Sequence, residues 1–454
     1  MGRTIGLIGA GKSTSYLIKY LLDKSKSENF VLHIADQSVE HLDPKVTHHQ
    51  NISIYTANML DDQLRAEWIK DKNLIISMLP ARFHHLVATD CVASRVPMLS
   101  ASYISDEIRA MENEIKQNGL LFMFEMGVDP GIDHMSAMQV IDRIKSEGGK
   151  MELFESFTGG LIAPESDTNL WNYKFTWNPR NVVMAGQGGA AKFLQEGTYK
   201  YIPYHKLFRR TEFLDIEGYG KFEAYANRDS LKYQSVYGLD DIKTLYRGTI
   251  RKVGFSKAWN YLIELGMTDD SYQISNSKGM SYRAFTNMFL PYSPTNTVEL
   301  KLRHYLKIDQ DDSIWDKLVE LDLFKEECLI EIANGTPAQI LQEILSKKWH
   351  LEETDKDMIV MYHKFGYQRD GRFKQLDASM GVIGIDSRYT AMAKTVGLPL
   401  GITAIHMLNN TIKLTGIQLP TRKEIYERVL KELVEFDIQF TERECPYHGY
   451  HHKP

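Results

Sequence analysis

The sequence predicts an α/β fold in which the first third of the chain forms a doubly wound, mostly parallel sheet. Two observations lead to this prediction: short apolar runs alternate with stretches of helical periodicity, and a glycine-rich turn directly follows the first run. The expected strands are Thr4–Ile8, Phe30–Ala35, Ile52–Thr56, Leu74–Met78, Met98–Ala101 and Leu120–Phe124. The expected helices between them end near Ser25 or span Asp61–Asp71, Phe83–Ser94 and Asp106–Gln117.

Size and composition narrow the class of protein. The chain has 454 residues, which predicts two or three domains, and it is 43% hydrophobic and 25% charged, as is ordinary for a soluble globular protein. The formal net charge of -5 favours neither nucleic acid nor an anionic membrane as a partner. No run of about 18 apolar residues predicts a membrane span. Three widely spaced cysteines predict reduced thiols in a cytoplasmic protein: Cys91, Cys328 and Cys445.

The glycine-rich turn fits two patterns. Residues Gly6–Ser13 match the phosphate loop of nucleoside triphosphatases, whereas Gly9, Gly11 and Thr14 nearly match the dinucleotide fingerprint, with Thr14 where Gly or Ala is usual. Only five residues precede the first glycine of the phosphate-loop pattern, too few for the strand that such a loop requires. Asp36 ends the second strand 25 positions after Gly11, close to the offset of roughly 20 at which a carboxylate meets a ribose. We therefore favour a Rossmann domain, with the triphosphatase as the alternative.

The Rossmann interpretation assigns a role to each residue of the turn. Gly9 and Gly11 let the backbone approach a pyrophosphate closely, and Lys12 and Ser13 begin a helix whose N–H groups face that anion. Asp36 would accept hydrogen bonds from the ribose hydroxyls and repel a 2′-phosphate. No Arg or Lys follows it, so the sequence favours NAD over NADP. The alternative for Asp36 is a helix cap or a turn residue.

A polar loop follows the last strand of the predicted sheet. Glu125, Asp129, Asp133 and His134 crowd around two glycines and a proline, just past the carboxyl end of that strand. Open α/β sheets place their active sites at this edge. The proline and the glycine after it can open the next helix. The alternative is an ordinary strand-turn-helix in which an aspartate caps the helix.

Two neighbouring strands end at the same edge of the sheet. Leu79 and Pro80 follow the fourth strand, and their backbone is expected to face the cofactor. Ser102 and Tyr103 follow the fifth strand, on the side of the polar loop. No metal site is predicted, because two adjacent histidines point to different sides of a helix and are expected at the surface: His84 and His85.

The remaining two thirds of the chain predict further domains. Residues 128–239 combine a helix with strand patterns, residues 240–349 are helical and poor in strands, and residues 350–387 return to strand patterns. The helix that comes next is expected to break near Pro399. Residues 413–454 predict a charged amphipathic helix and a terminal tail.

Seven segments, taken together, resemble the glutamate-forming saccharopine dehydrogenase family, also called saccharopine reductase. The match runs through nearly the whole chain, and blocks in this order are specific, whereas the dinucleotide glycines alone would not be. The segments are Ala101–Ser105, Gly127–His134, Gly159–Glu165, Tyr173–Trp177, Asn227–Ser230, Arg247–Arg251 and Ala391–Pro399.

The resemblance implies three domains. Residues 1–127 would form a Rossmann domain, on which residues 388–412 pack back. Residues 128–239 and 350–387 would form an α/β domain that binds saccharopine and dimerises, so the family resemblance implies a homodimer. Residues 240–349 would be an all-α domain inserted in the second.

The resemblance also implies an activity in lysine metabolism. Saccharopine would be oxidised with NAD or NADP and water to L-glutamate and L-2-aminoadipate 6-semialdehyde, or formed by the reverse reductive condensation. Arg228 and Arg251 would bind substrate carboxylates as planar, bidentate donors. The further substrate contacts that the resemblance implies are Ser102, Tyr103, Asp129 and Thr249. Two positions would lie beside the cofactor: Val128 and Trp177.

The reaction needs a base that takes a proton from the secondary ammonium of saccharopine. Asp129 is the first candidate, because it is expected beside the nicotinamide, and Tyr103 is the second. Alternatively, Asp129 only binds the substrate ammonium. Asp133 and His134 are expected to fix the hinge, since both fall inside the first helical turn.

The chain departs from the family at two positions, and rival functions remain open. Thr14 occupies the third glycine position, and whereas fungal members carry Arg after the second strand and use NADP, this chain has Asp36 and no Arg there. One rival is an oxidoreductase of the same superfamily that forms carboxynorspermidine or homospermidine, although Arg228 and Arg251 argue against a polyamine substrate. The other rival is a non-catalytic dinucleotide-binding scaffold.

Overall fold

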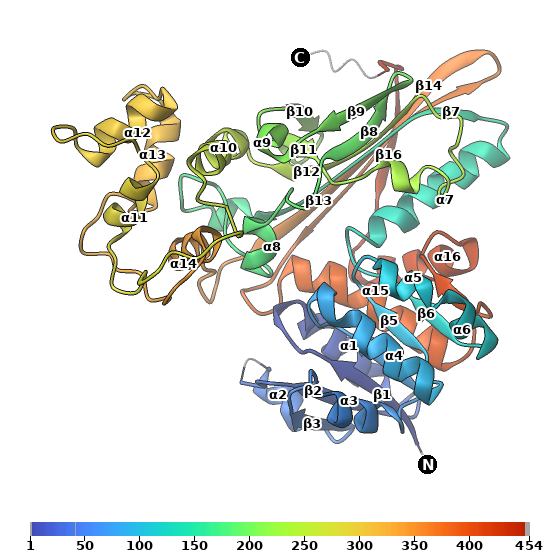
Figure 1. Cartoon of the computed structure of the whole chain (residues 1–454). Coiled ribbons are helices and arrows are strands. Elements are labelled where there is room, and N and C mark those ends of the chain that lie inside the picture. The colour runs from blue at the N-terminus through green and yellow to red at the C-terminus, as the bar shows by residue number, and fades with distance from the viewer. Residues whose placement is uncertain (1, 41, 450–454) are drawn as a thin grey trace.

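Two sheets and a helical lobe make up the computed structural model, which describes residues 2–40 and 42–449 (Figure 1). The first sheet and its helices lie at the bottom of the view, the second sheet lies above, and the lobe of residues 255–348 extends to the left. The architecture confirms the predicted fold class: a Rossmann domain, a second α/β domain and an all-α insertion.

The first sheet is entirely parallel and has the order β15-β6-β5-β4-β1-β2-β3. Its strands are β1 (Arg3–Ile8), β2 (Phe30–Asp36), β3 (Ile52–Thr56), β4 (Leu74–Ser77), β5 (Met98–Ser100), β6 (Leu121–Met123) and β15 (Gly416–Gln418). The helices around it are α1 (Ser15–Ser25), α2 (Pro44–Thr47), α3 (Asp62–Ile69), α4 (His84–Ser94), α5 (Asp106–Ala110) and α6 (Glu112–Gln117). All six strands predicted for this sheet are confirmed. The strand order reverses between β1 and β4, which is where doubly wound sheets bind ligands.

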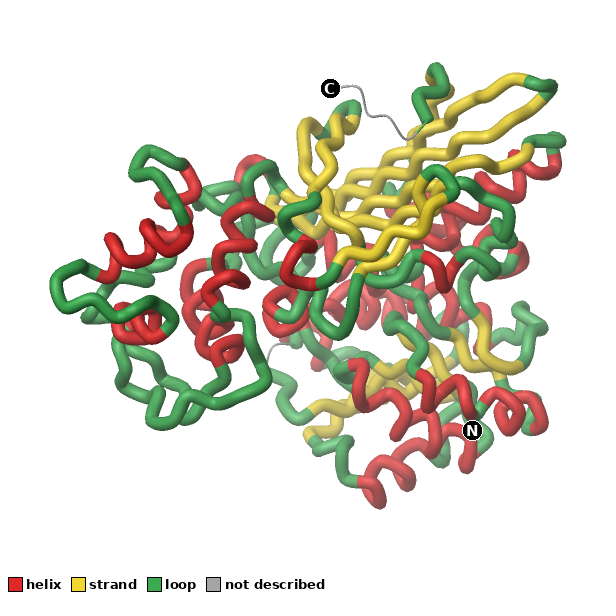
Figure 2. The backbone as a smooth tube through the Cα atoms, turned by 45° about the horizontal axis from the view of Figure 1, so that its top comes forward, coloured by secondary structure: helices red, strands yellow, loops and turns green. Residues whose placement is uncertain are grey.

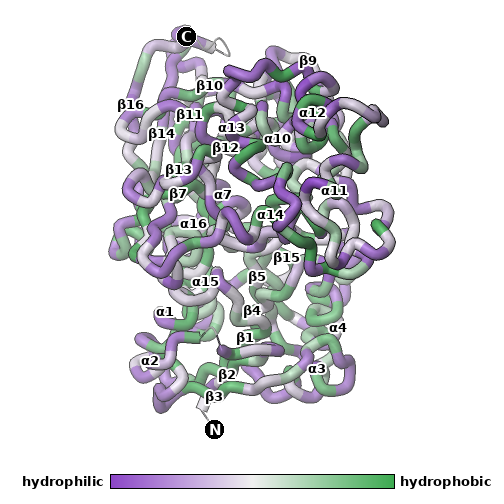
Figure 3. The backbone as a smooth tube through the Cα atoms, turned by 90° about the vertical axis from the view of Figure 1, so that its left-hand side faces the viewer, coloured by the Kyte–Doolittle hydropathy of each residue, from purple (hydrophilic) through white to green (hydrophobic). Residues whose placement is uncertain are grey.

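Burial of its strands explains why the first sheet could be predicted from the sequence. Helices cover both faces, so strand residues such as Ile5, Leu7 and Leu74 have no exposed surface, and Figure 3 shows β1, β4 and β5 as hydrophobic. Gly6 lies inside β1, where a Cβ would come within 2.6 Å of the side chain of Ile75. Gly6 therefore serves strand packing and does not open a phosphate loop, which removes the basis for the triphosphatase alternative.

The second sheet is mixed and has the order β10-β11-β12-β7-β13-β14-β16, with the hairpin of β8 and β9 attached to β12 (Figure 2). Among the strands formed by the described residues of this sheet, only β7 and β12 pair in parallel. Its strands are β7 (Lys150–Ile162), β8 (Ala191–Gln195), β9 (Thr198–Ile202), β10 (Thr211–Ile216), β11 (Gly220–Ala226), β12 (Thr244–Arg251), β13 (Asp357–Arg369), β14 (Arg372–Ile383) and β16 (Thr441–Cys445). Helix α7 (Ile132–Ser146) leads from the first domain and packs on this sheet. A short α8 (Pro179–Val183) precedes β8 in the chain, and a short α9 (Tyr204–Leu207) lies between β9 and β10.

Two of the predicted domain limits are wrong. Strand β12 falls inside the range 240–349, so the helical lobe begins only after it, with α10 (Phe255–Leu265). The sequence pattern did not predict β12, because seven of its eight residues are buried and burial on both faces removes the alternation that marks a strand. The other helices of the lobe are α11 (Tyr282–Met288), α12 (Val298–Leu306), α13 (Ser313–Glu320) and α14 (Pro337–Lys348).

The range 413–454 also contains more than a helix and a tail. Besides α16 (Lys423–Leu433), it supplies β15 to the first sheet and β16 to the second. Both strands are short and find their partners far away in the sequence, so local pattern could not reveal them. The end of the predicted tail, residues 450–454, lies outside the described residues.

Helix α15 (Ala391–Leu408) does not break at Pro399, contrary to the prediction. It packs against α1, and a Cβ on Gly397 or Gly401 would come within 2.7 or 2.6 Å of that helix. Close packing and burial offset the cost of a proline in a helix, about 3 kcal/mol. α15 is also the one helix of the described residues that is long and apolar enough to cross a membrane, but 72% of it is buried in the protein, which accounts for its composition.

Candidate active site

The glycine-rich turn after β1 has the geometry that a pyrophosphate requires. Gly9 adopts φ +89°, and a Cβ there would lie 2.9 Å from the backbone of Met78, so only glycine fits. Gly11 faces open space, because a Cβ there would meet no atom within 4 Å. Gly11 and the exposed Lys12 line a cavity of about 230 Å³. The turn therefore leaves room for an anion at the start of the helix.

Thr14 replaces the third glycine of the fingerprint without disturbing the turn. Its side chain is buried, and its hydroxyl donates a hydrogen bond to the Gly11 carbonyl at 2.7 Å. Ser13 beside it is partly buried. The departure from the family pattern is thus compatible with dinucleotide binding.

Asp36 ends β2 and contacts the glycine-rich turn directly. Its Oδ2 accepts a hydrogen bond from the Ala10 amide at 2.6 Å, and its Oδ1 accepts one from the Ser38 amide at 3.1 Å. Asp36 is therefore a turn residue, as the alternative interpretation expected. The same contacts hold its negative charge at the carboxyl end of β2, where dinucleotide-binding sheets receive a ribose.

A buried histidine links the ends of β4 and β5. His84 is 1% exposed, so the prediction that it lies at the surface is wrong. Its Nδ1 is 2.8 Å from the Ser77 hydroxyl, and its Nε2 is 2.8 Å from the hydroxyl of Ser102. Burial lowers the pKa of His84 to about 4, so the ring is neutral at neutral pH. His84 thereby fixes the orientation of Ser102, a predicted substrate contact.

A tight turn connects the first domain to α7 and presents Asp129. The Gly127 amide donates to the Pro130 carbonyl at 2.8 Å, and the Ile132 amide donates to the Gly127 carbonyl at 2.9 Å. Gly131 has φ +148°, and a Cβ there would collide with Gly127. The sequence Gly-Val-Asp-Pro-Gly closes on itself for this reason, and it places Asp129 between the two domains.

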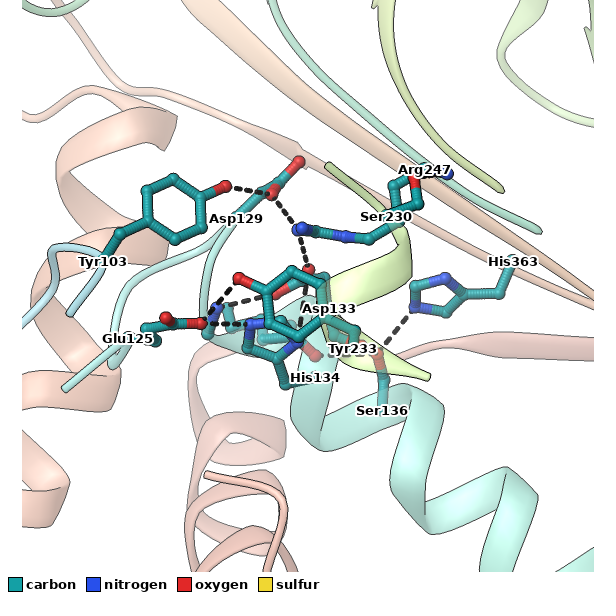
Figure 4. A network of polar contacts seen from close by, with 12 residues as sticks. Tyr103, Glu125, Asp129, Asp133, His134, Ser136, Ser230, Tyr233, Arg247 and His363 are labelled. Atoms are coloured by element: carbon teal, nitrogen blue, oxygen red, sulfur yellow. Dashed lines mark hydrogen bonds and ion pairs between the residues drawn. The ribbon is translucent and has the colours of Figure 1, made fainter. Parts of the chain in front are cut away.

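Asp129 lies in a network of charged side chains (Figure 4). One Arg247 nitrogen, Nη2, donates to Oδ1 of Asp129 and to Oδ2 of Asp133, both at 2.6 Å. The Tyr103 hydroxyl approaches Asp129 Oδ1 from the opposite side at 3.5 Å. The two domains meet here, because Tyr103 follows β5 whereas Arg247 belongs to β12.

Burial and charge set the protonation of these groups. Burial, with a contribution from Asp133, raises the pKa of Asp129, although Arg247 opposes that shift. Burial favours protonation of Asp133 too, but His134, Arg247 and the Gly131 amide outweigh it and lower its pKa. Burial and the Asp129 charge raise the pKa of Tyr103, so its phenol stays protonated. Asp129 can therefore exchange a proton, whereas Tyr103 is suited to donate a hydrogen bond.

A second group of buried side chains, linked by hydrogen bonds, lies next to the turn and stabilises it. His134 Nε2 is 2.9 Å from Glu125 Oε2, and His134 Nδ1 is 2.6 Å from the Tyr237 hydroxyl. The Tyr233 hydroxyl donates to the same Glu125 oxygen at 2.9 Å. Glu125 and His134 are at most 1% exposed, which excludes contact with a substrate and supports the prediction that His134 fixes the hinge.

The two predicted carboxylate-binding arginines have no acidic partner among the described residues. Arg251 is 5% exposed, its Nη1 donates to the Ile250 carbonyl, and its Nε has no hydrogen-bond partner. The exposed Arg228 lies with its guanidinium carbon 5.6 Å from the centre of the Tyr103 ring. Because a buried cation without a counter-ion is costly, Arg251 is poised for an anionic ligand.

Strand β12 places three polar residues of the site on one face, two of them predicted substrate contacts and the third, Arg247, identified from the structure. Arg247, Thr249 and Arg251 alternate along the strand and therefore point to the same side of the sheet. Four residues of strand separate the two arginines by about 13 Å. A substrate with an amine at Asp129 can thus reach Arg251 with a distant carboxylate.

The remaining predicted cofactor contacts lie around the same edge. Leu79 and the exposed Pro80 follow β4, and Val128 precedes Asp129 in the turn. Trp177 comes from the second domain and packs against two hydrophobic clusters, one shared by the two α/β domains and one shared by the second sheet and the helical lobe. Their positions agree with a cofactor that lies along the carboxyl edge of the first sheet.

Sequence reasoning missed Arg247 and His84 as site residues. The signal for Arg247 was its spacing of four from Arg251, which places both side chains on one face of a strand and also on one face of a helix. No local signal marks His84, because its burial depends on how α4 packs on the sheet. Metal sites were not predicted, and the described residues contain no group of three or more His, Cys, Asp or Glu placed to hold a metal ion.

A dinucleotide-binding domain whose carboxyl edge faces an acid, a phenol and unpaired arginines defines a nicotinamide-dependent oxidoreductase acting on an anionic substrate. Comparison with known proteins makes this class specific. A family model described as Saccharopine dehydrogenase NADP binding domain matches residues 5–123, and one described as Saccharopine dehydrogenase C-terminal domain matches residues 127–438. The chain belongs to the saccharopine dehydrogenase family, as its sequence segments indicated.

Individual relatives cover most of the chain. The saccharopine dehydrogenase (NADP(+), L-glutamate-forming) of Saccharomyces cerevisiae is 31% identical over 383 residues, which are 83% of this chain and 85% of that protein. The mitochondrial alpha-aminoadipic semialdehyde synthase of Bos taurus is 30% identical over 440 residues, which are 96% of this chain but 47% of that protein. The apo structure of the Saccharomyces cerevisiae saccharopine dehydrogenase (L-Glu forming) matches with a TM-score of 0.87 and 28% identity, covering 98% of this chain and 100% of that one.

Proposed function

We propose that this protein is a saccharopine dehydrogenase that converts saccharopine and water to L-glutamate and L-2-aminoadipate 6-semialdehyde, or catalyses the reverse condensation. The observation that carries the proposal is the position of Asp129. It lies at the junction of the two domains, between Tyr103 and Arg247. Two arginines without an acidic partner among the described residues belong to the same region: Arg228 lies over the Tyr103 ring, and Arg251 lies four residues along β12 from Arg247. Saccharopine has a secondary amine and three carboxylates, and the site offers a carboxylate base and cations for such a molecule.

Asp129 acts as the base in this proposal. It accepts a proton from the secondary ammonium, so that the nitrogen lone pair assists hydride loss from the lysine ε-carbon. The dinucleotide supplies the acceptor for that hydride. Tyr103 donates a hydrogen bond from its protonated phenol, and Asp129 returns a proton when the carbinolamine formed by water collapses to amine and aldehyde. Arg247 holds the Asp129 carboxylate in place through the 2.6 Å contact.

The arginines distinguish saccharopine from a polyamine substrate. We expect Arg228→Ala and Arg251→Ala each to raise the KM for saccharopine roughly tenfold to a hundredfold, because each removes a charge-assisted hydrogen bond. Steady-state assays of saccharopine oxidation check this, with the exposed Arg210→Ala as the matched control. Unchanged KM values in both variants would favour the carboxynorspermidine or homospermidine class instead.

The assay that tests the function uses wild-type enzyme with glutamate and aminoadipate semialdehyde. NADH and NADPH are supplied in parallel, and saccharopine is identified as the product. A scaffold would show no turnover with either cofactor. Fluorescence titration of the six tryptophans with NAD(H) and NADP(H) then distinguishes two explanations for a lack of turnover. A scaffold with a working Rossmann domain would still bind a dinucleotide, whereas a degenerate Rossmann domain would bind neither cofactor.

For the cofactor, we propose NAD, although the matching family model and fungal relatives carry NADP in their names. Asp36 supports this choice, because its carboxylate lies beside the glycine-rich turn and would repel a 2′-phosphate. We expect Asp36→Ala combined with Gln37→Arg to shift the ratio of kcat/KM values toward NADP by at least tenfold. Glu67→Ala, which removes an exposed acid of α3, should leave that ratio unchanged. An unchanged ratio in the Asp36 variant would contradict the assignment.

We also propose that the protein works as a homodimer in a reducing compartment such as the cytoplasm. The three cysteines form no disulfide. Large aromatic side chains stand exposed on the second sheet, where a second copy would cover them: Tyr199, Tyr201 and Phe213. The net charge and fold supply no reason to expect nucleic acid as a partner.

A further inference from the structure

Lys232 lies at the active site although it belongs to none of the segments that carry the family resemblance. It forms part of a short 3-10 helix, Leu231–Tyr233, which begins three residues after Arg228. Its ammonium lies 4.4 Å from the centre of the Tyr103 ring and 4.7 Å from that of Tyr233. These distances indicate cation–π contacts with one ring from each domain.

The ammonium of Lys232 has no acidic partner within 4.0 Å among residues 2–40 and 42–449. Arg247 nearby differs, since it is paired with Asp129 and Asp133. Loss of solvent lowers the pKa of Lys232; Glu125 opposes this shift, whereas Arg247, Arg109 and Arg228 add to it. Positive charge is therefore in excess around the exposed end of Lys232, a condition that a bound anion would relieve.

Arg228 contributes to the excess of positive charge around Lys232. Its guanidinium carbon is 5.6 Å from the same Tyr103 ring over which Lys232 lies. Two unpaired cations from one loop thus surround one ring of the opposite domain. Arg251 is set apart, since its guanidinium lies against Tyr173 and Phe255, near the helical lobe.

We propose that Lys232 and Arg228 together bind the two carboxylates of the glutamate arm of the substrate, which makes Lys232 a specificity-determining residue. The inference rests on the proposed function. It follows from matching charges: the glutamate arm carries two carboxylates and faces two adjacent cations, whereas the lysine arm carries one carboxylate and faces the isolated Arg251. A dicarboxylic amino acid is then preferred over one with a neutral side chain, because only the former compensates both cations.

The reductive reaction tests this assignment, with L-glutamate and L-glutamine compared as amino donors at saturating aldehyde and cofactor. We expect Lys232→Met to raise the KM for glutamate roughly tenfold while kcat stays within about twofold, as for loss of a charged contact made equally in ground and transition states. For glutamine, which lacks the side-chain charge, kcat/KM should change little, so the preference for glutamate falls about tenfold. Lys232→Arg should retain most of the preference.

Lys221→Met is the matched control, since Lys221 is an exposed lysine of the same domain without an ion pair among the described residues. Thermal unfolding and NADH titration of Lys232→Met check that the fold and cofactor site are intact, and Lys232→Gln serves as a second variant if methionine impairs folding. An unchanged KM for glutamate overturns the inference, and so does an equal loss for glutamine, which would indicate a merely structural role. A wild-type enzyme without glutamate-dependent turnover would instead refute the proposed function itself.

Discussion

Replacement of Asp129 by asparagine is expected to lower kcat for saccharopine oxidation by about 10² to 10⁴, the usual cost of removing a general base. Asparagine keeps the size and most of the hydrogen bonding of the side chain but cannot accept the proton. The affinity for the dinucleotide should stay within about threefold of the wild-type value, because the glycine-rich turn and Asp36 are untouched. Steady-state assays and tryptophan fluorescence titration measure the two quantities separately.

A matched control for this variant is Asp241→Asn, which changes an exposed carboxylate of the second domain. Its kcat should equal that of the wild type. A loss below tenfold in Asp129→Asn would show that Asp129 only binds the substrate ammonium, which was the alternative role. A large loss of cofactor affinity would show that the turn itself had been disturbed.

Replacement of Arg247 by methionine is expected to move the acid limb of the kcat/KM profile to higher pH. Arg247 lowers the pKa of Asp129, whereas burial and Asp133 raise it. Removal of the guanidinium therefore raises that pKa further, and Asp129 becomes an active base only at a higher pH than in the wild type. The profile of kcat/KM reports the free enzyme, in which the network of Figure 4 is formed.

The same variant should be less stable by about 3 to 5 kcal/mol, because it leaves Asp129 and Asp133 as neighbouring buried acids without their cation. Denaturant unfolding measures this loss, and Arg247→Lys, which retains the charge, should recover part of the stability and of the pH profile. An unchanged acid limb in a folded Arg247→Met enzyme would contradict the assignment of that limb to Asp129. A shift to lower pH would contradict the sign of the Arg247 effect.

The first domain was predictable because its signals are local. Apolar runs, helical stretches and the turn at Gly9 and Gly11 each occupy a few consecutive residues, and burial on both faces of a parallel sheet keeps its strands apolar. Asp36 and Asp129 were placed at the same edge of the sheet because each lies at or just after the carboxyl end of a parallel strand. Recognition of seven ordered segments extended the prediction to the second domain and to the substrate.

The errors have a common physical cause. Strands β15 and β16 form only by pairing with segments far away in the sequence, and β12 lacks the alternation that marks a strand because it is buried on both faces. Helix α15 continues through Pro399 while it is buried against α1. None of these conditions is visible in a window of neighbouring residues. Tertiary packing overrides local preference wherever a segment gains more from a distant partner than it loses locally.

By itself, the sequence determined the class of protein, the dinucleotide-binding turn and the choice of Asp129 as the central acid. Only the tertiary structure decided the electrostatics around that acid: Arg247 shared by two carboxylates, a protonated Tyr103 and an unpaired Lys232. The physical reason is that a pKa and a charge pairing depend on distances of a few ångströms between groups that the chain separates by more than a hundred residues.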